Sequence, residues 1–63
     1  MTAKNLTIIF NTRIPMTFRE LEYEIHDGIL ELHDIKGYPK YYKKLYPLNT
    51  IAHVTVNYDE DED

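Results

Sequence analysis

Two histidine-aspartate pairs lie seven residues apart in the sequence, His26-Asp27 and His33-Asp34. The stretch that contains them also carries Glu24 and Glu31, so no other part of the chain body brings so many ionisable groups together. Imidazole and carboxylate groups bind metal ions and also act as general acids and bases. Whether they could act together depends on the backbone element that carries them.

The residue pattern predicts that this stretch is a β-hairpin. Apolar and polar residues alternate from Glu20 to His26, which is typical of a half-buried strand, and Asp27-Gly28 is typical of a two-residue type I′ turn before Ile29 to His33. Such a turn pairs His26 with Ile29, Ile25 with Leu30, Glu24 with Glu31, Tyr23 with Leu32 and Glu22 with His33. The side chains predicted to share the buried face are Leu21, Tyr23, Ile25, Leu30 and Leu32.

This hairpin argues against a metal or acid-base site. His26 and His33 would lie on the outer face, roughly 13 Å apart, whereas one metal ion needs donors about 2 Å from itself. We expect a solvated face with a weak surface ion pair between His33 and Glu22. His53 has no neighbour at ligand spacing, so the sequence predicts neither a metal nor a cofactor.

A helix over residues 17–27 is the alternative for the second segment. Pro15, Thr17 and Glu20 resemble a helix-capping sequence, and Gly28 could end such a helix. That alternative would make the fold α+β.

The other segments also indicate strands. Leu6 to Asn11, Tyr41 to Tyr46 and Ile51 to Tyr58 are rich in β-branched, aromatic and apolar residues and are separated by turn residues. The last strand is expected to bury Ala52, Val54, Val56 and Tyr58, while Leu45, Leu48 and Ile51 close one end of the core. The predicted fold is all-β, a five-stranded antiparallel meander in a strongly bent sheet or small barrel.

Size and charge divide the chain into a body and a tail. Its 63 residues allow one small domain, predicted over residues 1–58, followed by a disordered acidic tail from Asp59 to Asp63. Without the tail, the chain has seven basic and six acidic side chains, so its body is nearly neutral. A chain this small has no cysteine for a disulfide, so a homodimer is one way to stabilise it.

The composition also disfavours several function classes. The chain has no serine and no cysteine, and it has no glycine-rich phosphate loop, so we expect a protein that is not an enzyme. Its longest apolar run, Leu6 to Phe10, is too short for a membrane span or signal peptide, which predicts a cytoplasmic protein without membrane contact.

Binding is the function that the sequence favours. Six tyrosines offer rigid contact area, and the leading hypothesis is a protein-interaction module. Its candidate partner-binding residues are Tyr38, Tyr41, Tyr42, Lys43, Lys44, Tyr46, Asp59, Glu60, Asp61, Glu62 and Asp63. The alternatives are single-stranded nucleic-acid binding through Lys36 to Tyr46, and self-association without another partner.

Three segments carry a resemblance to a group of known proteins. They are Ile8 to Phe10, Phe18 to Asp34 and Tyr46 to Val56, in which the strand and turn residues resemble small uncharacterised β-proteins of Gram-positive bacteria and their phages. The resemblance carries no catalytic residue. It implies a phage or mobile-element accessory protein that binds and inhibits a host nucleic-acid-handling or defence protein, as anti-CRISPR-type inhibitors do.

Overall fold

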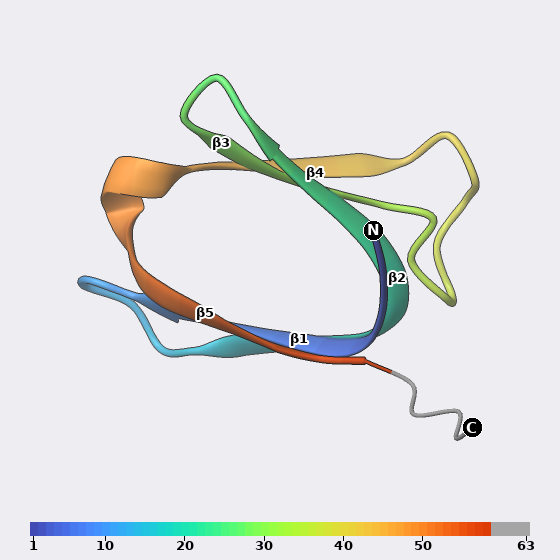
Figure 1. The fold of residues 1–63 in the computed structure, drawn as a ribbon, viewed down its shortest axis with the longest axis horizontal. Coiled ribbons are helices and arrows are strands. Elements are labelled where there is room, and N and C mark those ends of the chain that lie inside the picture. The colour runs from blue at the N-terminus through green and yellow to red at the C-terminus, as the bar shows by residue number, and fades with distance from the viewer. Residues whose placement is uncertain (59–63) are drawn as a thin grey trace.

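The computed structural model describes residues 1–58 as one curled sheet of five antiparallel strands (Figure 1). Its spatial order is β4-β3-β2-β1-β5, and a short 3₁₀ turn, η1, joins β4 to β5. The elements are β1 Thr2–Phe10, β2 Met16–His26, β3 Ile29–His33, β4 Lys43–Pro47, η1 Leu48–Thr50 and β5 Ile51–Asn57. The predicted all-β class and bent five-stranded sheet are confirmed.

The path of the chain explains the curl. Strands β1 to β4 follow one another as a meander, and β5 then returns to pair with β1. Figure 1 shows β3 and β4 lying across from β1 and β5, with η1 connecting the two sides. The sheet curls without closing, because β4 and β5 remain its two edges.

The bend within β2 lies at Glu20, whose φ is +53°. This left-handed backbone conformation interrupts the alternation of faces, so that Phe18 and Leu21 are both buried while Arg19 and Glu20 between them are exposed. The Glu20 carbonyl accepts a hydrogen bond from the Lys36 N–H at 2.9 Å, which ties the bend to the loop after β3. The helix considered for residues 17–27 was wrong, because this segment forms strand β2.

The core lies inside the curl and contains side chains from β1, β2, β3 and the residue Ile35. Its buried members are Ala3, Leu6, Ile8, Phe10, Phe18, Leu21, Tyr23, Leu30, Leu32 and Ile35. The edge strands β4 and β5 also contribute partly buried apolar side chains that pack against this cluster, so all five strands share one small core.

The hairpin register is confirmed pair for pair, from His26 opposite Ile29 to Glu22 opposite His33. Asp27 and Gly28 have φ values of +52° and +72°, as a type I′ turn requires. The predicted burial of Ile25 was wrong, since 56% of it is exposed. Pairing between β1 and β2 ends at Glu22, so the last part of β2 projects beyond β1 and leaves Ile25 at the rim.

Ala52 and Leu45, both in the last third of the chain, are exposed although burial was predicted for them. Ala52 is exposed because the pairing shifts by one residue where Ile9 pairs with His53 and Phe10 with Ile51, leaving Ala52 as the extra residue. Leu45 is 57% exposed, because alternation along β4 puts Lys44 and Tyr46 on its more buried face.

The end of β5 agrees with the prediction only in part. Val54 and Val56 pack against the core as expected, whereas Tyr58 is exposed. The Tyr58 hydroxyl is hydrogen-bonded to that of Tyr23, and this bond is the main reason that the pKa of Tyr23 is raised to about 12.

Candidate functional site

Three exposed tyrosines come together in the loop between β3 and β4. We call Tyr38, Tyr41, Tyr42, Lys43 and Lys44 the tyrosine-lysine surface. The tyrosines are all exposed, Tyr41 most of all at 87%. In Figure 1 this loop extends beyond the curled sheet.

The local backbone explains why the tyrosines lie in a loop. The Tyr38 N–H donates to the Ile35 carbonyl at 3.0 Å, and the Tyr42 N–H donates to the Pro39 carbonyl at 3.0 Å, so two tight turns follow one another. Gly37 has a φ of +91°, which suits glycine in the first of them. The predicted strand from Tyr41 was therefore wrong at its start, since β4 begins at Lys43.

The surface is organised by aromatic contacts. The rings of Tyr38 and Tyr42 stack with their centroids 5.2 Å apart and their planes at 22°. The Lys44 ammonium group lies 5.5 Å from the centroid of Tyr42 and 5.9 Å from that of Tyr38. Stacking and cation-π attraction thus order the rings before any partner arrives.

Tyr46 lies apart from this surface. It is partly buried, its ring meets that of Phe10 edge-on at a centroid distance of 5.5 Å, and its hydroxyl is 3.9 Å from the Met16 sulfur. Its contacts therefore join β4 to β1 and β2 in the core. The acidic candidates Asp59 to Asp63 lie outside the described residues.

Most lysines of this region already have a partner. The Lys43 Nζ is 3.3 Å from Glu31, the Lys36 Nζ is 3.3 Å from Glu20, and Lys44 lies over the tyrosine rings. Lys40 lines a hollow beside Tyr38. Phosphate groups would have to compete with these internal contacts for three of the four lysines.

His26 and His33 belong to two separate groups of side chains on the outer face of the hairpin. His26 Nε2 is 2.9 Å from Glu31, and its Nδ1 is 3.3 Å from Asp27. His33 instead lies 3.6 Å from Asp34 and 3.8 Å from Glu24. The expected ion pair with Glu22 is replaced by these two contacts, although Glu22, His33 and Asp34 remain close enough to be considered as metal ligands.

The contacts around His26 shift the pKa values of His26 and Glu31 in opposite directions. The hydrogen bond that His26 donates to Glu31 is the main reason that the pKa of His26 is raised above 6.5, and it likewise lowers the pKa of Glu31 below 4.5. Because the pKa of His26 is raised on folding, its contribution to stability is present at low pH and is lost as pH rises through the folded pKa. Because the pKa of Glu31 is lowered, its contribution is present at high pH and is lost as pH falls through the folded pKa. The pair therefore contributes most between pH 4.5 and 6.5.

We expect Glu31→Gln to lower the pKa of His26 toward 6.5, because the charged acceptor is lost. An NMR titration of the His26 imidazole measures this directly. The matched control is Glu24→Gln, which removes a carboxylate of the same face that does not contact His26 and should leave its pKa unchanged. Equal effects of the two variants would contradict the assigned contact.

Comparisons with protein-family models, with curated proteins and with solved structures give no match to this chain. In the described part of the chain, no helix has the length and apolar character needed to cross a membrane. The candidate site therefore has to be interpreted from its own geometry.

Proposed function

We propose that this protein is a non-catalytic interaction module that binds another protein through the tyrosine-lysine surface. The observation that carries the proposal is the exposed, stacked pair Tyr38 and Tyr42, with Lys44 over the rings. An aromatic pair ordered in this way loses little conformational freedom on binding, which favours affinity.

The residue types also fit a protein partner. Tyrosine is enriched at the centres of protein interfaces, because its ring buries a large apolar area while its hydroxyl makes hydrogen bonds. Tyr41, the most exposed of the three, provides an additional ring for a partner's pocket. Carboxylates of a partner would have to compete with the internal contacts of Lys43 and Lys44, as phosphates would, so the exposed rings carry the proposal.

Single-stranded nucleic acid is the second candidate, favoured by the 87% exposure of Tyr41 beside several lysines. Bases stack on such rings, and lysines contact phosphates. The internal partners of Lys36, Lys43 and Lys44 weaken this candidate, because each contact would have to be exchanged for a phosphate.

The resemblance to phage and Gram-positive β-proteins extends the proposal to the kind of partner. In this proposal the protein acts in the cytoplasm as an inhibitor of a host nucleic-acid-handling or defence protein. Self-association as a homodimer is the structural alternative, and light scattering over a dilution series distinguishes it.

An affinity pull-down from bacterial lysate, with and without nuclease, tests the proposal. We expect one protein to be retained by the full-length chain after nuclease treatment and to be lost with Tyr41→Ala. The control is Ile14→Ala, because Ile14 is similarly exposed at 81% but lies in the loop between β1 and β2. Retention that depends on nucleic acid would support the second candidate instead.

The acidic tail is proposed to accelerate association. Five consecutive carboxylates from Asp59 to Asp63 would steer the protein toward a basic region of the partner, an effect that salt screens. We expect a chain ending at Tyr58 to associate more slowly at low salt and to show a weaker salt dependence. Equal association rates in stopped-flow measurements would remove the tail from the mechanism.

A further inference from the structure

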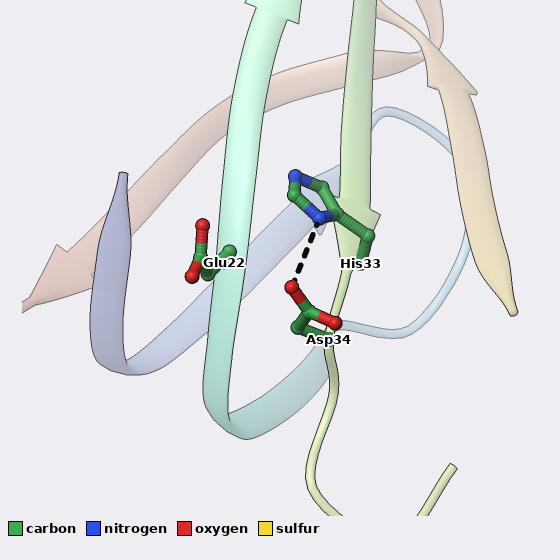
Figure 2. Close-up of side chains that lie close together, drawn as sticks. All are labelled: Glu22, His33 and Asp34. Atoms are coloured by element: carbon green, nitrogen blue, oxygen red, sulfur yellow. Dashed lines mark ion pairs between the residues drawn. The ribbon is translucent and has the colours of Figure 1, made fainter. Parts of the chain in front are cut away.

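Three potential metal ligands meet at one end of the β2-β3 hairpin, on the face opposite the core. Glu22 and His33 lie directly across from each other on adjacent strands, and Asp34 follows His33 at the end of β3. One donor atom from each of the three lies within 4.8 Å of the other two. Figure 2 shows the Glu22 and Asp34 carboxylates beside the same imidazole ring.

The two nitrogens of His33 have different surroundings. Nδ1 is 3.6 Å from the Asp34 carboxylate. Figure 2 marks this ion pair with a dashed line. Nε2 is 3.8 Å from the Glu24 carboxylate, is inaccessible to solvent and has no hydrogen-bond partner among the described residues. In metal sites the free N–H of a ligating histidine is usually directed to a carboxylate, which fixes the ring and the tautomer. Glu24 is placed to have this role.

We propose that Glu22, His33 and Asp34 bind a divalent transition-metal ion, with zinc as the best-suited probe. One imidazole nitrogen with two carboxylate oxygens is a ligand set that zinc accepts, and two carboxylates neutralise its charge. Three donors at a mutual separation of 4.8 Å would each lie roughly 2.8 Å from a central ion, compared with about 2.0 to 2.2 Å in zinc sites. Each donor therefore has to move by less than about 1 Å.

The surroundings leave room for a further ligand. Glu22 and Asp34, but not His33, line an open hollow at the surface, so the two carboxylates are open to solvent on that side and leave room for a water ligand. Lys4, Lys36 and Lys40 line the same hollow. His26 belongs to a different group with Glu31 and Asp27 and does not take part. The site thus uses one of the two histidine-aspartate pairs together with a carboxylate from the neighbouring strand.

Zinc titration of the full-length chain, followed by NMR of the histidine imidazoles, tests this site. We expect saturable changes at His33 Nδ1, with Nε2 keeping its proton, while His26 and His53 change little. Glu22→Gln and Asp34→Asn should each weaken zinc binding at least about tenfold, because each removes a charged ligand while keeping the side-chain size. Asparagine also tolerates the φ of +49° at Asp34.

Matched variants in the other group provide the control. Glu31→Gln and Asp27→Asn remove carboxylates around His26 and should leave the zinc affinity at His33 unchanged. The acidic tail is present in every variant, so binding to it cannot produce a difference between them. The proposal is overturned if His33 shows no saturable change up to about 1 mM zinc, or if Glu22→Gln and Asp34→Asn bind zinc as tightly as the unaltered chain.

Discussion

Replacing Leu30 by alanine is expected to lower the free energy of unfolding by about 2 to 5 kcal/mol. Leu30 is fully buried and follows the first residue of β3, and its truncation leaves a cavity between the two sides of the curled sheet. A chain of 63 residues has a total stability of roughly 3 to 9 kcal/mol, so the variant would be near its unfolding limit at room temperature. Urea denaturation followed by circular dichroism measures the loss.

Leu45→Ala is the matched control for this variant. It makes the same chemical change in the neighbouring strand β4, at a side chain that is 57% exposed. We expect a change in unfolding free energy within about 0.5 kcal/mol, because little apolar surface is uncovered and no cavity forms. Similar losses at Leu30 and Leu45 would contradict the location of the core.

Replacing Tyr42 by alanine is expected to weaken partner binding by about 2 kcal/mol, or roughly 30-fold in Kd. Tyr42 stacks on Tyr38 and lies closest to the Lys44 ammonium, so its removal takes away the contacts that order the surface. Calorimetry with the protein recovered by pull-down measures the change in Kd. The fold should persist, because Tyr42 lies outside the core.

Tyr42→Phe separates the ring from the hydroxyl group. Phenylalanine keeps the stacking and the cation-π contact, so we expect most of the affinity to remain. If phenylalanine weakened binding as much as alanine does, the hydroxyl rather than the ordered stack would determine affinity. If neither variant changed the Kd, the tyrosine-lysine surface would not be the interface.

The sequence predicts the hairpin well because two independent signals agree. Alternation over Glu20 to His26 defines the two faces, and Asp27-Gly28 fixes which residues pair. The sequence does not predict which apolar residues of the alternating pattern remain exposed to solvent. Ile25 has the predicted face, but its burial depends on where β1 begins, since Thr2 pairs with Glu22 and no residue of β1 lies opposite Ile25. The exposure of Ala52 depends on a one-residue shift opposite Ile9 and Phe10.

The candidate site is only partly predictable for a similar reason. The residue types of Tyr38 and Tyr42 and the neighbouring lysines predict a binding surface, yet the stacking of the two rings follows from two successive turns that this pattern does not specify. Tyr46 has the same local composition but turns into the core. The residue pattern predicts a strand from Tyr41, whereas the Tyr42 N–H donates a hydrogen bond to the Pro39 carbonyl and closes a turn there.

The histidines show how a correct distance argument leaves another grouping open. The register places His26 and His33 too far apart to share an ion, and they do lie in separate groups. This separation does not exclude a site formed by one histidine with neighbouring carboxylates. The cluster of His33 with Glu22 and Asp34 depends on the turn of the backbone after β3, where the φ of Asp34 is +49°.

Amide chemical-shift mapping tests the proposed interface most directly. Isotope-labelled full-length protein is titrated with the recovered partner, and the backbone signals are followed for residues 1–58. We expect the largest changes from Tyr38 to Lys44, with little change along β5. Changes concentrated on β5 or in the loop between β1 and β2, with residues 38–44 unaffected, would contradict binding through the tyrosine-lysine surface.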